Sequence, residues 1–352
     1  MKAVKMYGIN DLRVEEVSKP SPAADEVLLK VEAVGVCGSD VPRVLKKGPH
    51  KLPLILGHEF AGQVVELGSG VQGWHEGDRV AVAPLIPDYN DPWSKKGVYS
   101  LSEGYLYYGS RNDGAWAEYL AVKADNLVKI ADNVPYDWGA TIDPAANAVH
   151  ACLRAKLSAE DTLAVFGLGS IGLFAIQYAV AIGVKRIFAI DIDDEKLDVA
   201  KQSGATDLIN GKAEDAVQAI QEATNKLGVD VALEMSGTEI CQIQSVQSLG
   251  KMGRAVYLGI SNQPLTYPKE VVDKILRYQL TVTGSWNSFS DPFPGFEWTE
   301  SAKLMAEGKM NPEPMITQRL TLDDIPATFN KINNRELRYI KVMFYPQGVP
   351  NE

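Results

Sequence analysis

A short apolar run, Thr162–Phe166, passes directly into the glycine-rich stretch Gly167-Leu168-Gly169-Ser170-Ile171-Gly172. The run predicts a buried strand, and the apolar residues after the last glycine predict a helix through Ile182. Between a strand and a helix, the first glycine permits a tight turn, the second lets the backbone approach a pyrophosphate, and the third allows close packing. The helix amino terminus adds N–H donors and a positive dipole. This stretch therefore predicts a dinucleotide site.

An acid in the next predicted strand supports the same prediction. Arg186–Ile190 reads as a strand that closes on Asp191, where an acid binds the ribose 2′-hydroxyl. Asp191 would repel a 2′-phosphate, and Ile192-Asp193-Asp194 offers no arginine, so we expect NAD rather than NADP. A chance glycine turn is the weaker alternative, and Lys196 either reaches the ribose or is a solvated helix lysine. The predicted cofactor-binding residues are Gly167, Gly169, Ser170, Ile171, Gly172, Asp191 and Lys196.

The alternation of strand and helix continues along the middle of the chain and predicts a doubly wound parallel sheet. Its further strands are expected at Val229–Leu233, Ala255–Leu258 and Leu280–Thr283. The first part of the chain instead predicts short strands separated by turns, at Glu26–Val34, Ala61–Leu67 and Asp78–Val82. Near the end of the chain, a closing strand is expected at Tyr339–Phe344. We therefore predict an α/β protein with a nucleotide domain at 149–287 inside a β-rich domain built from 1–148 and 288–352.

The bulk composition limits the classes of function. A formal charge of −10 and an isoelectric point near 5.1 disfavour nucleic acid and anionic membrane surfaces as partners, so a small-molecule substrate is expected. Neither a signal-peptide pattern nor an 18-residue apolar window is found. Three widely spaced cysteines, Cys37, Cys152 and Cys241, make no disulfide framework. We expect a cytoplasmic protein.

One of these cysteines, Cys37, and the histidine His58 are candidate metal ligands. Cys37-Gly38-Ser39-Asp40 follows a predicted strand, and Gly57-His58-Glu59 comes about twenty residues later. A thiolate and an imidazole are zinc ligands, and a catalytic zinc site takes three protein ligands and keeps an open position. Spacing alone also fits a cysteine and a histidine that are simply buried in a core.

A longer motif around His58 narrows this choice by resemblance. Gly57-His58-Glu59-x2-Gly62-x5-Gly68-x2-Val71 resembles the signature of the zinc-containing medium-chain alcohol dehydrogenases in every fixed position, and Gly77–Val80 resembles the turn that follows it. The resemblance extends to about residue 345. It implies a GroES-like catalytic domain and a Rossmann NAD-binding domain, with Cys37 and His58 as zinc ligands and Glu59 as an alternative ligand.

The third ligand implied by the resemblance is Asp143. Ile142-Asp143-Pro144 stands where the polyol branch of the family usually has Ile-Glu-Pro. Aspartate is one methylene shorter than glutamate, so coordination of zinc by Asp143 would need a small backbone shift or a bridging water; otherwise Glu59 would take its place. The other interpretation of Asp143 is a helix N-terminal acid that answers the dipole, with Pro144 in the first turn.

The family's second zinc site lacks its thiolates here. The four positions that match the cysteines of the structural zinc lobe are Asp88, Asp91, Ser94 and Ser102. A closed structural site requires nitrogen or sulfur ligands. We therefore expect one catalytic Zn²⁺ per chain and no structural zinc.

The resemblance implies a zinc-dependent oxidoreductase that transfers hydride between NAD and an alcohol or polyol. Ser39 resembles the family's proton-relay hydroxyl, and His50 would extend the relay; a turn serine and an exposed loop histidine are the alternatives. A zinc-free quinone reductase and a nucleotide-binding protein without catalysis are the competing functions.

Three segments resemble the subgroup that acts on galactitol 1-phosphate or pentitol 5-phosphates and forms the keto-sugar phosphate: Cys37–Arg43, Gly109–Gly114 and Gly284–Trp298. Arg43 and Arg111 can grip a phosphate, and Trp286 can provide an aromatic wall. Either arginine could instead be an ordinary surface residue. Free polyols such as sorbitol or xylitol are the alternative substrates, and a homodimer or homotetramer is expected.

Overall fold

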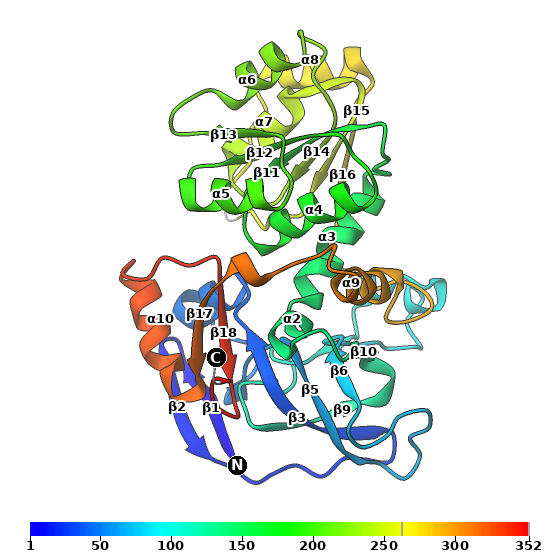
Figure 1. The fold of residues 1–352 in the computed structure, drawn as a ribbon, viewed down its shortest axis with the longest axis vertical. Coiled ribbons are helices and arrows are strands. Elements are labelled where there is room, and N and C mark those ends of the chain that lie inside the picture. Colours follow the sequence, from blue (N-terminus) through cyan, green and yellow to red (C-terminus); the bar gives the residue numbers. More distant parts are fainter. Residues whose placement is uncertain (262, 351–352) are drawn as a thin grey trace. The chain divides into compact units, whose positions relative to one another are not determined.

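The structure, a computed structural model, describes residues 1–261 and 263–350. The chain divides into two compact units (Figure 1). The first unit comprises Met1–Asp143, Ser288–Glu307 and Pro312–Glu352, and the second comprises Pro144–Asn287 and Gly308–Asn311. Among the described residues, no helix has both the length and the apolar character needed to cross a membrane.

The second unit is built on a six-stranded sheet in the order β13-β12-β11-β14-β15-β16, and every pairing in it is parallel. Its strands are β11 (Thr162–Phe166), β12 (Arg186–Asp191), β13 (Asp207–Asn210), β14 (Val229–Glu234), β15 (Leu249–Tyr257) and β16 (Thr281–Gly284). Its helices are α4 (Ser170–Ala181), α5 (Asp194–Gln202), α6 (Ala216–Ala223), α7 (Glu239–Gln247) and α8 (Lys269–Tyr278), and α3 (Ile142–Arg154) crosses the boundary between the units. The predicted doubly wound parallel sheet is confirmed.

Local sequence explains these elements. The residues of β11 are almost fully buried because helices cover both faces of a parallel sheet, and their sequence is accordingly a continuous apolar run. Side-chain caps start three helices: Asp193 caps α5, Asp215 caps α6 and Thr238 caps α7. Strand β15 begins earlier than its apolar core predicts, because β14 and β15 continue to pair through a register shift.

The first unit is mainly β-sheet. Its largest sheet has the order β10-β6-β5-β3-β18-β17, with β9 also paired to β3; β1, β2 and β4 form a second sheet, and β7 pairs with β8. The strands are β1 (Lys2–Gly8), β2 (Asp11–Glu16), β3 (Glu26–Gly35), β4 (Leu54–Ile55), β5 (Glu59–Leu67), β6 (Arg79–Val82), β7 (Leu85–Ile86), β8 (Leu106–Tyr107), β9 (Tyr119–Lys123), β10 (Leu127–Lys129), β17 (Ile316–Thr321) and β18 (Lys341–Tyr345). The helices are α1 (Asp40–Pro42), α2 (Tyr136–Ala140), α9 (Phe296–Ala306) and α10 (Ile325–Asn333). Short 3₁₀ or π turns are η1 (Arg43–Lys47), η2 (Ser94–Lys96), η3 (Tyr99–Leu101), η4 (Ala124–Asn126), η5 (Glu313–Met315) and η6 (Leu322–Asp324). The GroES-like β-rich domain expected from the sequence is confirmed.

The register of the largest sheet brings distant segments to one edge. Gly35, at the end of β3, pairs with Glu59, at the start of β5, and also with Met343 of β18. The segment after β3, the start of β5 and the start of β18 therefore meet there. Beneath them lies an apolar core that includes Trp116, Phe329 and Phe344.

Candidate functional site

The edge where β3 ends and β5 begins gathers three potential metal ligands. One ligand atom each from Cys37, His58 and Glu59 lies within 4.8 Å of the other two. Both His58 and Glu59 are buried, and Cys37 is partly buried. The antiparallel pairing of β3 with β5 explains why residues about twenty positions apart in sequence meet here.

Two glycines make room for this cluster. Gly57 has a φ of +90°, and a Cβ at this position would lie 2.5 Å from Cδ1 of Trp116. At Gly35, a Cβ would lie 2.5 Å from Oε2 of Glu59. Side chains at either position would therefore displace the indole or the carboxylate.

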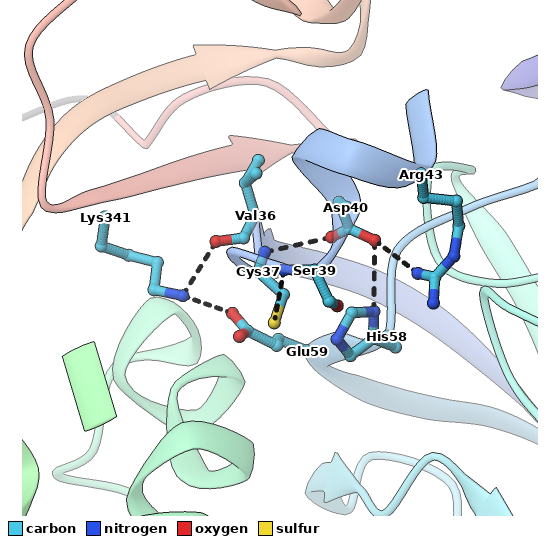
Figure 2. A network of polar contacts seen from close by, with 8 residues as sticks. All are labelled: Val36, Cys37, Ser39, Asp40, Arg43, His58, Glu59 and Lys341. Atoms are coloured by element: carbon cyan, nitrogen blue, oxygen red, sulfur yellow. Dashed lines mark hydrogen bonds and ion pairs between the residues drawn. The ribbon is translucent and has the colours of Figure 1, made fainter. Parts of the chain in front are cut away.

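Asp40 organises one side of the cluster (Figure 2). Its carboxylate is fully buried; Oδ2 accepts a hydrogen bond from the Cys37 backbone N–H at 3.0 Å, and Oδ1 lies 3.5 Å from Nδ1 of His58. Arg43 also donates to Oδ1, at 3.0 Å. Burial raises the pKa of Asp40, but the nearby His58 and Arg43 outweigh it, and the pKa is lowered. Sequence reasoning missed this role of Asp40, although its position three residues after Cys37 could have indicated it.

Lys341 closes the other side of the cluster. Its ammonium donates to Oε2 of Glu59 at 2.6 Å and to the backbone oxygen of Val36 at 3.0 Å, and only 3% of Lys341 is exposed (Figure 2). Burial lowers the pKa of Lys341, but the charges of Glu59 and Cys37 raise it by more, so the net shift is upward. No local signal in the sequence indicates this lysine, because only the pairing of β18 with β3 brings it here.

Asp143 lies near the cluster but is not one of its three closest members. It is the second residue of α3 and is 5% exposed. Burial raises the pKa of Asp143 to about 7; the charge of Glu59 also raises it, while His58 and Lys341 lower it. These electrostatic interactions indicate a carboxyl group close to the predicted ligands, at the start of a helix, so both interpretations of Asp143 remain compatible with its position.

The donor set fits a zinc ion. Burial lowers the pKa of His58, but the charges of Asp40 and Cys37 raise it well above the usual value, because both groups lie close to the imidazole. A thiolate, an imidazole and a carboxylate are the ligand types that zinc prefers. Because Nδ1 of His58 faces the Asp40 carboxylate, its Nε2 is presented as a ligand. The Ser39 backbone N–H lies 3.5 Å from Sγ of Cys37, the second ligand atom. Cys37, His58 and Glu59 would hold the ion, with Asp143 as a further ligand.

Of the two predicted phosphate-binding arginines, Arg43 contacts the cluster through one residue, and Arg111 is linked to it through two tyrosines. Arg43 contacts it through Asp40, as described above. On the other side the ring of Tyr107 lies edge-on to His58 at 5.8 Å, Tyr105 lies 6.2 Å from Tyr107, and the guanidinium of Arg111 lies 4.2 Å above Tyr105. Arg111 also donates to the backbone oxygen of Tyr105 at 2.7 Å, which holds it in place.

The predicted relay residues have different surroundings. His50 is exposed; partial burial and the charges of Arg111 and Arg43 lower its pKa, so it lies in the field of both arginines. Ser39 is partly buried beside Cys37, and its side chain makes no capping hydrogen bond to α1. A relay through these two residues stays a prediction.

In the second unit, the predicted glycine turn lies between β11 and α4. Gly167 has a φ of +95°, and a Cβ at Gly172 would lie 2.1 Å from the Gly167 oxygen. Asp191 ends β12, and its Oδ2 accepts from the backbone N–H of Leu168 at 2.7 Å, so the acid and the glycine turn are physically joined. Nζ of Lys196 lies 4.0 Å from the same carboxylate. Together with Ser170 and Ile171 at the start of α4, these residues form a candidate nucleotide site.

Trp286 also belongs to the second unit, and its side chain is half exposed. Its role as an aromatic wall for the substrate stays a prediction.

The lobe that would match the structural zinc site is held by other interactions. Asp88 accepts from the backbone N–H of Asn90, and Asp91 accepts from those of Trp93 and Glu103. Ser94 and Ser102 are buried. Tyr99 donates to Asp291 at 2.8 Å and packs edge-on against Phe293 at 5.3 Å. Turn hydrogen bonds and aromatic packing stabilise this segment.

Comparisons with known proteins agree with both halves of this description. A model of the alcohol dehydrogenase GroES-like domain matches residues 23–132, and a model of the zinc-binding dehydrogenases matches residues 170–303. Galactitol 1-phosphate 5-dehydrogenase of Escherichia coli K12 is 40% identical over 296 residues, which cover 84% of this chain and 85% of that protein. (R,R)-butanediol dehydrogenase of Bacillus subtilis 168 is 33% identical over 360 residues, with 98% and 100% covered.

Solved structures give the same result. The crystal structure of galactitol-1-phosphate dehydrogenase from Escherichia coli matches with a TM-score of 0.93 and 36% identity, covering 98% of this chain and 100% of that one. A protein of Sinorhizobium meliloti 1021, described as a zinc-binding dehydrogenase and solved with bound NADP, matches with a TM-score of 0.91 and 31% identity over 98% and 99% of the two chains.

Proposed function

Because this chain belongs to the zinc-binding alcohol dehydrogenase family, we propose that it oxidises a phosphorylated sugar alcohol, such as galactitol 1-phosphate or a pentitol 5-phosphate, to the keto-sugar phosphate with NAD. The observation that carries the choice of substrate is the pair of arginines near the metal cluster, Arg43 through Asp40 and Arg111 through the tyrosines. The 40% identity to a galactitol 1-phosphate 5-dehydrogenase supports the same choice.

In this proposal the residues of the cluster each have a role. Cys37, His58 and Glu59, with Asp143 nearby, hold one zinc ion, which when bound supplies a Lewis acid that lowers the pKa of a substrate hydroxyl. Asp40 fixes the orientation of His58, and Lys341 fixes that of Glu59. In the proposed relay, the Ser39 hydroxyl, next to the cluster, accepts the substrate proton as it gives its own proton to His50, which then releases a proton to solvent.

The arginines recognise the phosphate in this proposal. A guanidinium has five N–H donors and binds phosphate in a bidentate manner. Asp40 engages Nη1 of Arg43, and the backbone oxygen of Tyr105 engages Nη1 of Arg111, so each arginine is oriented and retains further donors.

The choice of NAD rests on Asp191. Its carboxylate is tied to the glycine turn through Leu168, where it would accept from a ribose hydroxyl and repel a 2′-phosphate. Lys196, 4.0 Å away, weakens that repulsion, and a relative was solved with NADP. Turnover with NAD and NADP at matched concentrations tests the preference; equal or faster turnover with NADP would contradict it.

The substrate test compares kcat/KM for galactitol 1-phosphate and pentitol 5-phosphates with the values for the unphosphorylated parents. We expect the phosphorylated compounds to be preferred by about a hundredfold, the effect of one or two charge-assisted contacts. Arg111→Ala should erode that preference and leave the rates with free polyols unchanged, while Lys96→Ala, a lysine beside Trp93 in the lobe, serves as a charge-matched control.

A free polyol or diol is the second candidate substrate, favoured by the 33% identity to a butanediol dehydrogenase. If a free polyol is turned over as efficiently as its phosphate, this second candidate replaces the first.

We also propose that the chain forms a homodimer or homotetramer. Strand β16 is the last strand of its sheet, and apolar side chains are exposed on it (Val282) and on α8, the helix before it in the chain (Val272 and Leu276). Exposed apolar side chains beside an unpaired strand edge favour association. Light scattering on the purified protein tests this, and a monomer at micromolar concentration would contradict it.

A further inference from the structure

A buried carboxyl group in the second unit has no role in the function proposed above. Glu234 ends β14 and is 0% exposed. In the sheet it pairs with Phe166, the residue directly before the glycine turn. An ionisable group in such a position has a high desolvation cost and needs compensating hydrogen bonds.

One oxygen of Glu234 receives those bonds from a single turn. Oε1 accepts from the Ser236 backbone N–H at 2.8 Å, from the Ser236 hydroxyl at 2.7 Å and from the Gly237 backbone N–H at 2.9 Å. The Ser236 hydroxyl also lies 2.9 Å from that of Thr238, which caps α7 by accepting from the Cys241 N–H. Burial raises the pKa of Glu234 by more than these donors lower it, so the net shift is upward. The carboxyl group therefore holds the whole turn between β14 and α7.

That turn packs against the nucleotide loop with no space between them. A Cβ at Gly167 would lie 2.9 Å from both Cβ and N of Ser236. On its other side, a Cβ at Gly237 would lie 2.4 Å from the Ile260 oxygen, and one at Gly259 would lie 2.0 Å from the Gly237 nitrogen. Three loops at the carboxyl ends of β11, β14 and β15 thus meet through glycine contacts, and the turn held by Glu234 is the middle one.

We propose that Glu234 is a positioning residue for the dinucleotide: by holding the Ser236–Gly237 turn against Gly167, it sets the shape of the loops that bind the cofactor. Ligands of open α/β sheets bind at the carboxyl ends of the strands, which is where these three loops meet. The inference rests on the nucleotide binding proposed above. A carboxyl group that only stabilised the start of α7 would affect folding and leave cofactor affinity unchanged.

Two conservative variants separate these roles. Glu234→Gln keeps the shape and one acceptor oxygen but places an NH₂ group at Oε2, which has no hydrogen-bond partner among the described residues. Ser236→Ala keeps the backbone donors and removes the hydroxyl that links Glu234 to Thr238. Thr224→Val is the matched control, because it removes a buried hydroxyl that bonds Ile220 and Gly228 just before the other end of β14.

The measurement is the Kd for NADH and NADPH, by nicotinamide fluorescence on the full zinc-loaded protein, with the melting temperature recorded in parallel. We expect both Glu234→Gln and Ser236→Ala to raise the Kd of the preferred dinucleotide about tenfold, because a turn that is held less firmly against Gly167 must be ordered when the cofactor binds. Thr224→Val should lower the melting temperature and leave Kd unchanged. The positioning role is overturned if both variants keep the wild-type Kd within twofold. If the wild-type protein binds neither dinucleotide, the proposed cofactor fails together with this role.

Discussion

The metal cluster and the glycine turn both lie at the ends of strands, but the metal cluster consists of side chains and the glycine turn mainly of backbone. At the metal cluster, side chains from the segment after β3, from the start of β5, from β18 and from the segment around Asp143 converge, and Glu59 and Lys341 are 282 residues apart in sequence. The glycine turn is made by the backbone of Gly167–Gly172 and one acid, Asp191. A site made of backbone is encoded locally, whereas a site made of side chains depends on how distant strands pair.

This difference affects how each site should respond to mutation. In the metal cluster, buried charges depend on one another, because an ion that loses its partner in the interior has no solvent to replace it. In the glycine turn, the limit is space, because a Cβ added at Gly167 or Gly172 would collide with the backbone. The following predictions test this contrast, beginning with the largest expected effect.

The first prediction tests whether the two sites are independent. Cys37→Ala should lower kcat about a thousandfold or more, because a Lewis acid contributes several kcal/mol and each factor of ten corresponds to about 1.4 kcal/mol. Elemental analysis should find about one zinc per chain in the wild type and a clear loss in the variant, while the Kd for NADH stays within twofold. Cys241→Ala, in α7, is the control. Two tightly held zincs in the wild type, or full activity of Cys37→Ala, would contradict the assigned site.

The second prediction concerns the mutual dependence of buried charges. In the zinc-free protein, Lys341→Met should lower the free energy of unfolding by about 3–5 kcal/mol, because it leaves Glu59 buried without a counter-charge. The double variant Glu59→Gln with Lys341→Met should recover part of this loss. Lys123→Met breaks solvent-accessible pairs with Asp25 and Glu26, and it should cost about 1 kcal/mol or less for each pair. Urea unfolding measures all of these, and strictly additive single and double effects would show that Glu59 and Lys341 are not coupled.

The third prediction concerns space in the glycine turn. A Cβ at Gly169 would meet no atom within 4 Å, and its φ of −72° suits alanine, so Gly169→Ala should keep the melting temperature. It should raise the Kd for NADH about tenfold, because the second glycine lets the backbone approach the pyrophosphate. Gly172→Ala should lower the melting temperature instead, because its Cβ would lie 2.1 Å from the Gly167 oxygen. Identical behaviour of the two variants would contradict the separate roles of these glycines.

The smallest effect is expected in the lobe without thiolates. The Ser94 and Ser102 hydroxyls are buried, and neither has a hydrogen-bond partner within the described residues. Replacing either serine with alanine removes no bond, so the free energy of unfolding should change by no more than about 0.5 kcal/mol, or increase slightly. Zinc content should also be unchanged. A loss of zinc in either variant would show that this lobe does bind metal.

The same contrast explains how much the sequence could predict. The parallel sheet and the glycine turn were predictable because strand, turn, helix and acid follow one another within about thirty residues. Cys37, His58 and Glu59 were found through a motif, and the structure brings these three together. Lys341 was missed because only the pairing of β18 with β3 brings it to the cluster. Glu234 was missed because two of its three donors are backbone N–H groups, which the sequence pattern does not indicate.

The pairing of β18 with β3 also has a consequence for the order in which this protein can assemble during synthesis. Glu59 and Lys341 are 282 residues apart, so at about 5–20 residues per second a ribosome makes the lysine roughly 14–56 s after the glutamate. Over that interval the second unit is synthesised in full between them, and its glycine turn needs no residue from β18. The nucleotide loops can therefore form on the nascent chain while the metal cluster still lacks its counter-charge, so the part of the protein that begins first is completed last.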